Sequence, residues 1–341
     1  MNKNKISILL CVFICCFLFL SGCNTSGYND LEKDTEKISI VCTTFPQYDW
    51  VKEIIGKNSK RFEVTLLLDS GIDLHSYQPT IEDISKISTA DIFIYTGGES
   101  DEWTKDILRE TTNQSIQTVN MLEVLGDAAK IEESIEGMQE TQHHEEHSKN
   151  DKHNEHNQHN EPEYDEHIWL SLKNAGLLVQ SICQQIIQAD TEYAEVYRYN
   201  AKQYIQKLEE LDKQYLQMIS TAKYHTLLFG DRFPFRYLAD DYNLDYYAAF
   251  SGCSAESEAG FETITFLSQK ADALNLPVIL TLENSNVQIA ETIKQNTKAK
   301  NQKILVLNSI QSVTNTDIEN HFTYLTAMQE NLKVLSQALN G

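Results

Sequence analysis

Two series of short β-rich runs, one on each side of a long helical stretch, constrain the fold of this 341-residue chain most strongly. In both series the runs alternate with segments whose apolar residues recur at helical spacing, which is typical of parallel sheets built from βαβ units. The expected strands are residues 38–42, 62–68, 91–95 and 115–120 in the first half, and residues 226–229, 244–250, 278–282 and 304–307 in the second. The pattern predicts an α/β fold with two similar lobes, each built on a parallel four-stranded sheet.

The stretch between the two series contains no proline or glycine over residues 177–222. Its apolar spacing predicts one helix that begins near Lys173, a break at Asp190, and a second helix over residues 193–218. A helix of that length is stiff, so as a backbone between two lobes it would limit how far they close. Ligands of such α/β sheets bind outside the carboxyl ends of the strands, and we expect the site there.

The N-terminus has the pattern of a targeting segment. Lys3 and Lys5 precede an apolar run over residues 6–20 that is too short for a comfortable membrane span. The run ends in Leu-Ser-Gly followed by Cys23, which resembles a bacterial lipobox in which this cysteine is lipidated. We therefore expect a signal peptide over residues 1–22, a polar tether over residues 23–37 and an extracytoplasmic, lipid-anchored protein. The alternative is an uncleaved anchor helix.

The net charge and the number of cysteines indicate which ligands and which kinds of site are not expected. The formal net charge of -22 would repel phosphate backbones, so nucleic-acid binding is not expected, whereas cations suit such a surface. Apart from the signal segment and Cys23, only Cys42, Cys183 and Cys253 remain. An odd and widely spaced set of cysteines predicts neither a disulfide framework nor a Cys-x-x-Cys metal site.

A histidine-rich acidic loop interrupts the first half over residues 139–166. Seven of the ten histidines fall between His143 and His167, in a stretch with almost no apolar residues. Neutral imidazole is a good ligand for zinc and other late first-row metals, so the loop indicates metal capture. A solvated low-complexity linker is the alternative. The histidines expected to act as an auxiliary metal loop are His143, His144, His147, His153, His156 and His159.

The sequence supports a catalytic role for this loop less well than it supports metal capture. Residues 143–147 match the His-x-x-Glu-His pattern of one zinc-protease class, but that pattern works only on a helix with an apolar face. No such face is present, and the chain carries no nucleophile elbow or phosphate loop. We therefore do not expect an enzyme.

Two histidines lie where loops meet expected structure. His75 follows the expected strand over residues 62–68, at its carboxyl end. His167 lies where the acidic loop meets an apolar Ile-Trp-Leu run, and Asp165 and Glu166 beside it could orient its ring. His225 and His321 have contexts that favour structural roles.

Motifs spread over both halves resemble the metal-binding solute receptors of bacterial ABC importers, the zinc and manganese class. They are Thr-Thr-Phe-Pro at residues 43–46, Leu-His-Ser-Tyr-Gln-Pro-Thr at 74–80, Ala-Asp-Ile-Phe-Ile-Tyr-Thr-Gly at 90–97, Asp-Glu-His-Ile-Trp-Leu at 165–170, Phe-Arg-Tyr-Leu-Ala-Asp-Asp-Tyr at 235–242, and Tyr-Leu at 324–325 with Met328, Asn331 and Leu332. The resemblance implies lobes over residues 38–171 and 223–341, a backbone helix within residues 172–222, and one metal in the cleft between the lobes.

The resemblance also implies a ligand set, and here the chain departs from the family. It assigns the first two ligands to His75 and His167. Strict spacing puts the third on Arg232, which is always protonated and cannot ligate, so a one-residue adjustment at Pro234 would bring in Asp231 instead. The fourth position is Asn308, a weak amide ligand. The acidic residues that could substitute for it are Glu283, Glu256 and Glu258.

The function that this resemblance implies is capture of Zn²⁺ and its delivery to an ABC permease driven by a separate ATPase. Nitrogen-rich ligation and the histidine loop favour zinc, and Mn²⁺ is possible. We expect a monomer. The alternatives are a manganese receptor of the same family, a surface metal-buffering or adhesion lipoprotein, and a receptor for chelated iron or a corrinoid.

Overall fold

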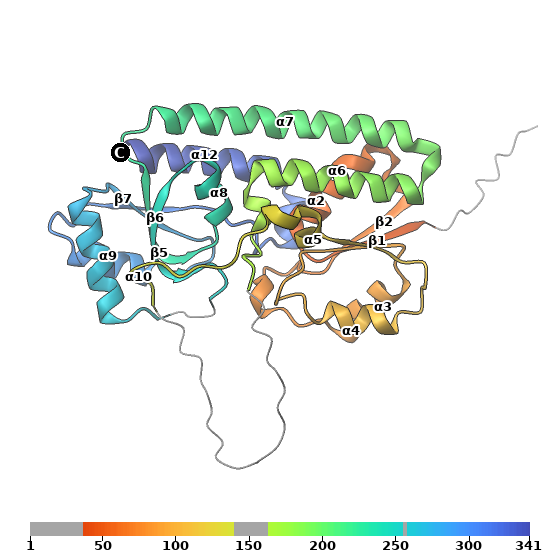
Figure 1. Ribbon diagram of the computed structural model, residues 1–341, viewed down its shortest axis with the longest axis horizontal. Coiled ribbons are helices and arrows are strands. Elements are labelled where there is room, and N and C mark those ends of the chain that lie inside the picture. The colour runs from red at the N-terminus through yellow and green to blue at the C-terminus, as the bar shows by residue number, and fades with distance from the viewer. Residues whose placement is uncertain (1–36, 140–162, 255–257) are drawn as a thin grey trace, which may run out of the picture. The chain divides into compact units, whose positions relative to one another are not determined.

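The computed structural model describes residues 37–139, 163–254 and 258–341 (Figure 1). Cys23, Glu256 and the six histidines of the auxiliary loop lie outside the described residues. Among the residues that are described, no helix combines the length and apolar character needed to cross a membrane.

The first sheet confirms the predicted parallel four-stranded architecture of the N-terminal half. Its strands are β1 (Ile38–Cys42), β2 (Phe62–Leu66), β3 (Ile92–Tyr95) and β4 (Gln117–Asn120), in the order β2-β1-β3-β4 with every pairing parallel. The connecting helices are α2 (Phe45–Ile55), α3 (Ile81–Thr89), α4 (Thr104–Glu110) and α5 (Met121–Leu125). Short 3-10 helices are η1 (Gly56–Arg61), η2 (Leu74–Ser76) and η3 (Gly126–Ala128).

The second sheet repeats this order in the C-terminal half. Its strands are β5 (Thr226–Phe233), β6 (Asp245–Ser251), β7 (Val278–Thr281) and β8 (Lys303–Val306), in the parallel order β6-β5-β7-β8. The helices are α8 (Arg236–Asp241), α9 (Phe261–Ala273), α10 (Gln288–Asn296), α11 (Asn315–Glu319) and α12 (Tyr324–Asn340). Strand β5 runs four residues beyond its predicted end at Phe229, and its register shifts between Phe229 and Arg232.

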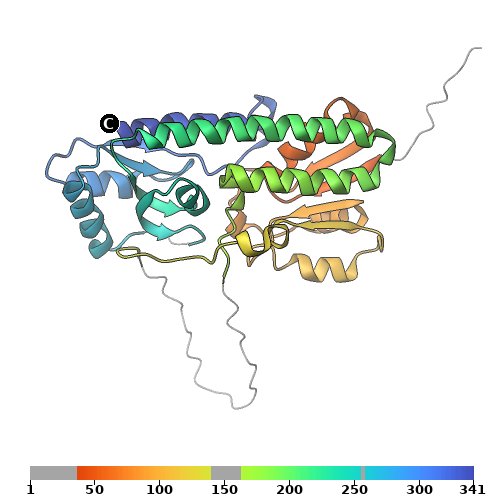
Figure 2. The ribbon, with the colours of Figure 1, turned by 45° about the horizontal axis from the view of Figure 1, so that its top comes forward.

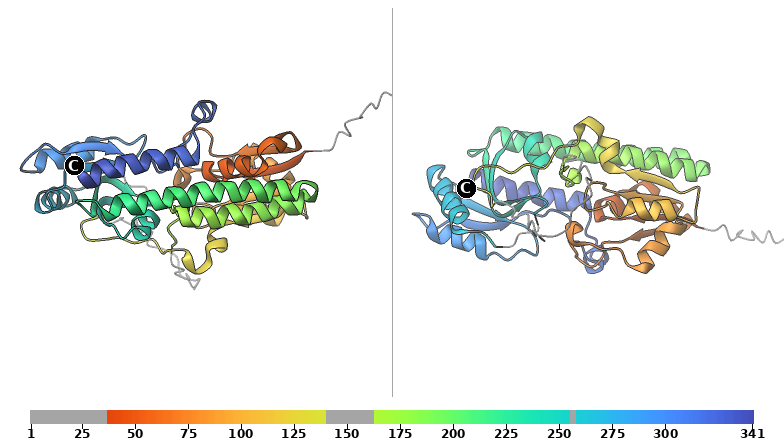
Figure 3. Two further views of the ribbon diagram at one scale, coloured as in Figure 1. Left: turned by 90° about the horizontal axis from the view of Figure 1, so that it is seen from above. Right: turned by 60° about the horizontal axis from the view of Figure 1, so that its bottom comes forward.

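The predicted backbone helix is α7 (Ala194–Ser220), whose 27 residues span about 40 Å. It follows α6 (Leu172–Ala189) and η5 (Thr191–Tyr193) after the predicted break at Asp190. Figures 2 and 3 show α7 running beside α6 and α12. The amide of Asn200 donates to the Ile54 carbonyl in α2, and the Tyr215 hydroxyl donates to the Met328 carbonyl in α12. One helix is therefore bonded to both halves.

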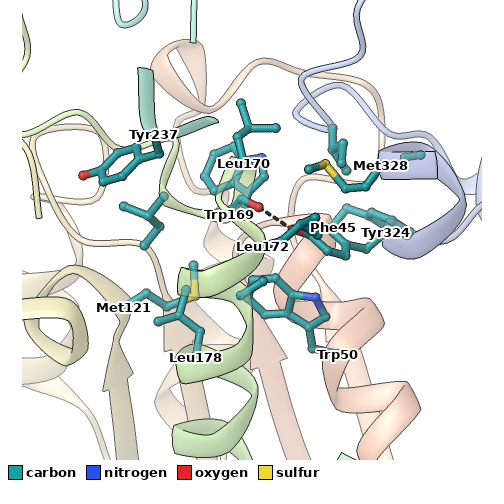
Figure 4. Close-up of a cluster of buried hydrophobic side chains, with 14 of the residues drawn as sticks. Phe45, Trp50, Met121, Trp169, Leu170, Leu172, Leu178, Tyr237, Tyr324 and Met328 are labelled. Atoms are coloured by element: carbon teal, nitrogen blue, oxygen red, sulfur yellow. Dashed lines mark hydrogen bonds between the residues drawn. The ribbon is translucent and has the colours of Figure 1, made fainter. Parts of the chain in front are cut away.

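A buried cluster between the two sheets fixes the segment that follows His167 (Figure 4). This segment, η4 (Ile168–Leu170), is fully buried. The indole of Trp169 donates to the Ser309 carbonyl, and the Trp169 carbonyl accepts a hydrogen bond from the Tyr324 hydroxyl at 2.5 Å. Burying large aromatic side chains on both sides of η4 leaves little freedom at position 167.

Candidate metal centre

His75 lies on η2, in the loop at the carboxyl end of β2. The Asp73 carboxylate caps this turn by accepting a hydrogen bond from the backbone N–H of His75 at 3.0 Å. Leu74 is buried, which anchors the turn against the core. The Nδ1 atom of His75 is 2.8 Å from the Ser100 hydroxyl oxygen and 3.5 Å from Glu166 Oε2.

His167 is completely buried, directly before η4. Asp165 Oδ1 accepts hydrogen bonds from the backbone N–H of His167 at 2.9 Å and from its ring Nδ1 at 3.0 Å. A carboxylate that holds one ring nitrogen fixes the tautomer and leaves the other nitrogen free to ligate. The role expected from the sequence for the acidic neighbours of His167 is therefore present for Asp165.

The free nitrogens of the two rings face each other. His75 Nε2 and His167 Nε2 are 3.2 Å apart, although the residues are far apart in the sequence. A proton on the Nδ1 of a ring, as the neighbouring carboxylates favour, leaves the lone pair of its Nε2 available to a metal. Two nitrogens bound to one tetrahedral zinc at 2.0–2.1 Å would be about 3.3 Å apart. The spacing of the two Nε2 atoms therefore fits a shared zinc ion.

The surroundings shift the pKa values of His75 and His167 in opposite directions. Burial, together with His167 and Arg232, lowers the pKa of His75 to about 3, so its ring is neutral at physiological pH. Burial also acts to lower the pKa of His167, but the carboxylates of Asp165, Glu132 and Glu166 outweigh it and raise that pKa. The site therefore combines a neutral donor with negative charge that attracts a cation.

Cys253, in the loop after β6, lies close to His75 and His167. Its Sγ and one ring nitrogen of each histidine all lie within 4.8 Å of one another, the one such group of three among the described residues. The thiol donates to Glu132 Oε2 at 3.5 Å, and the backbone N–H of Cys253 donates to Glu132 Oε1 at 3.2 Å. Burial and the nearby carboxylates raise the pKa of the Cys253 thiol, so it is protonated without a metal.

A hollow of about 360 Å³ adjoins this site. His75, Cys253, Glu132 and Glu166 line it, and aromatic side chains such as Trp103 complete the wall. Burial raises the pKa of Glu132 and of Glu166. Glu166 Oε2 is buried without a hydrogen-bond partner among the described residues. A cation would relieve this crowding of buried carboxylates.

Asp231 is not brought together with the two histidines in this structure. It lies inside β5, and its carboxylate accepts hydrogen bonds from the backbone N–H groups of Arg232 at 2.8 Å and Leu282 at 3.1 Å. It lines a separate hollow of about 360 Å³. Because β5 continues to Phe233, position 231 belongs to the sheet rather than to the loop that the sequence predicted.

The other acidic or amide candidates are held elsewhere. Asn308 Oδ1 accepts from the backbone N–H of Ile310, and both carboxylate oxygens of Glu283 accept from Ser309. Glu283 lines the same hollow as Asp231. Glu258 is exposed.

Sequence reasoning missed Cys253 and Glu132. The available signal was a cysteine at the carboxyl end of an expected strand, preceded by Gly252. A Cβ at position 252 would lie 2.9 Å from the Phe233 carbonyl oxygen and 3.3 Å from Cε1 of His167. Only glycine lets this loop lie so close to the imidazole.

Two parallel sheets joined by one long helix, with imidazoles meeting beyond the carboxyl ends of the strands, define a solute-binding protein of the metal-ion class. The family model described as zinc-uptake complex component A, periplasmic, matches residues 40–338. This chain belongs to that family.

Individual relatives agree with this assignment. The high-affinity zinc uptake system protein ZnuA of Bacillus subtilis is 30% identical over 331 residues, which is 97% of each chain. The zinc-binding lipoprotein AdcA of Streptococcus pneumoniae is 29% identical over 336 residues, 98% of this chain, so the chain spans 61% of the length of AdcA. The crystal structure of the Zn(II)-bound ZnuA-like domain of AdcA is 27% identical, with a TM-score of 0.67 over 90% of this chain and 100% of that domain.

Proposed function

We propose that this protein is the zinc-binding component of an ABC-type uptake system, which captures Zn²⁺ outside the cytoplasm and delivers it to a permease driven by a separate ATPase. Family membership and the names of the relatives support the uptake role. The single observation that supports metal capture at a defined place is the 3.2 Å separation between the Nε2 atoms of His75 and His167.

In this proposal the two histidines are the primary ligands of the transported ion. Both rings are preorganised, since Asp165 holds the Nδ1 of His167 while Ser100 and Glu166 flank the Nδ1 of His75. Rings that are fixed before the metal arrives lose little conformational entropy on binding it, which favours high affinity. Nitrogen donors favour zinc over manganese, which prefers oxygen ligands.

The sequence also suggests how the protein is attached to the membrane and how zinc is supplied to its site. We propose that residues 1–22 are removed, that Cys23 carries the lipid, and that residues 23–37 tether the domain to the membrane surface, in keeping with a relative named as a lipoprotein. The histidines of residues 139–166 would bind zinc weakly and raise its concentration near the hollow. Residues 38–171 and 223–341 would act as lobes, with the helices of residues 172–222 limiting their relative movement.

The test is a competition titration of the mature, full-length protein with Zn²⁺ and Mn²⁺ while bound ions are counted. We expect one tight zinc site that the double variant His75→Ala, His167→Ala loses. The matched control is His225→Ala, His321→Ala, which removes two histidines that belong to neither the pair nor the histidine loop. Tight zinc binding that survives in the first double variant would contradict the assignment, and a preference for Mn²⁺ would favour the manganese alternative.

A further inference from the structure

We propose that Cys253 supplies the third ligand of the ion, as a thiolate, and that the site therefore selects metals that prefer sulfur. This inference rests on the proposed zinc-binding function and adds a ligand type that the sequence motifs did not indicate.

The first argument is geometric. In a tetrahedral zinc site with Zn–N of 2.0–2.1 Å and Zn–S of 2.3 Å, ligand atoms lie about 3.3–3.6 Å apart. The two Nε2 atoms already have this spacing, and the whole group including Sγ lies within 4.8 Å. A movement of about 1 Å would complete the triangle. Cys253 is in a loop and is partly exposed, so it can make this movement, whereas buried His167 cannot.

The second argument concerns the orientation of the thiol. Glu132 accepts hydrogen bonds from both the backbone N–H and the Sγ–H of Cys253, which holds the sulfur on the side of the hollow that His75 lines. When the ion binds, the Zn–S bond forms, the S–H bond breaks, and the proton leaves to solvent. No oxidant or reductant is needed, since the sulfur keeps its oxidation state.

The third argument is that Asp231, the ligand expected from the sequence, is engaged elsewhere and lines a separate hollow. Arg232 is always positive, pairs with Asp73 and donates to the Ser254 carbonyl. The positive charge of this guanidinium acts on His75 and repels a divalent cation. The Asp231 carboxylate accepts hydrogen bonds from two backbone N–H groups.

A thiolate beside two imidazoles has a consequence for selectivity. Soft sulfur ligands favour zinc and cadmium, whereas manganese prefers carboxylate and water oxygens. We therefore expect Cd²⁺ to compete strongly with Zn²⁺ for this site, and Mn²⁺ to compete poorly.

The experiment uses Co²⁺ as a spectroscopic probe in the mature, full-length protein. Tetrahedral Co²⁺ bound to a thiolate gives a sulfur-to-metal charge-transfer band in the near ultraviolet, in addition to its visible ligand-field bands. We expect the charge-transfer band in the wild type and in the control Cys183→Ser, whose cysteine is buried between α6 and α7. In Cys253→Ser the band should disappear while visible bands remain. Zn²⁺ affinity should fall more than about 100-fold, beyond the 10- to 100-fold loss that removing a partner of a ligand causes.

Each other outcome has a defined meaning. Absence of the charge-transfer band in the wild type overturns the proposal even if Cys253→Ser fails to fold. It is also overturned if Asp231→Asn loses tight zinc binding while Cys253→Ser keeps it, because the third ligand would then be Asp231. Failure of the proposed function is a different result, namely tight zinc binding that survives in His75→Ala, His167→Ala.

Discussion

Arg232 and Asp73 form an ion pair that joins the end of β5 to the turn carrying His75. The same Asp73 carboxylate caps the backbone of His75, so one acidic residue connects the C-terminal half to a proposed ligand. Burial acts to raise the pKa of Asp73, but the Arg232 guanidinium outweighs it and holds that pKa below its usual value. The pair therefore stabilises this turn when both groups are charged.

Arg232→Gln should destabilise the protein by about 1–2 kcal/mol, because it leaves a largely buried carboxylate without its cation. Urea unfolding of the metal-free protein at pH 7 measures the loss. The matched control is Arg198→Gln, which breaks the exposed pair with Glu195 and should change stability by less than about 0.5 kcal/mol. Equal effects of the two changes would contradict a special role for the Asp73 pair.

Asp165→Asn should weaken zinc binding by about 10- to 100-fold while leaving a single site. The amide removes the negative charge that favours a proton on Nδ1 of His167, so Nε2 becomes a poorer donor. Competition with a zinc chelator of known affinity gives the change. Asp106→Asn, on the exposed surface of α4, serves as the control and should bind zinc like the wild type. An unchanged affinity in Asp165→Asn would show that Asp165 does not tune the ring.

Gly252→Ala should lower both stability and zinc affinity. The added methyl group would meet the Phe233 carbonyl oxygen and the ring of His167, so the loop that carries Cys253 must move. Thermal unfolding with and without Zn²⁺ reports both effects. Gly176→Ala is the control, because its Cβ would lie 3.8 Å from Ile205 on a helix and alanine favours helix formation. If Gly252→Ala is as stable as the control and binds zinc as tightly, position 252 is not packed closely against Phe233 and His167.

Asp49 should make the stability of the metal-free protein depend on pH. Burial raises its pKa to about 7, although the backbone N–H of Tyr324 opposes the shift. Between its unfolded pKa near 3.8 and about 7, the folded state holds more protons than the unfolded state, so this residue's contribution to stability declines as pH rises through that window. Urea unfolding at pH 5 and pH 7.5 should show a smaller decline in Asp49→Asn than in the wild type. An equal decline would exclude this role for Asp49.

Periodicity predicted the fold well because it depends on local apolar spacing. The eight expected strands all occur, and the break at Asp190 separates α6 from α7 as expected. The exact end of β5 could not be predicted, because the four residues after Phe229 carry mixed polar and aromatic side chains whose pairing with β6 is a tertiary effect. That difference put Asp231 in the sheet.

The candidate site was predictable only in part. His75 and His167 each lay beside a recognisable boundary, and the structure brings their rings together. Cys253 has no spacing signature, since a single cysteine after a strand is far more often structural. Its proximity to the histidines arises from the packing of one half against the other, which no local pattern records.

The most direct test of the central claim is anomalous diffraction at the zinc absorption edge from crystals of the zinc-loaded mature protein. We predict one strong peak within about 2.0–2.1 Å of the Nε2 atoms of both His75 and His167. A fully occupied zinc ion located elsewhere, with these two rings not bound to it, would contradict the account.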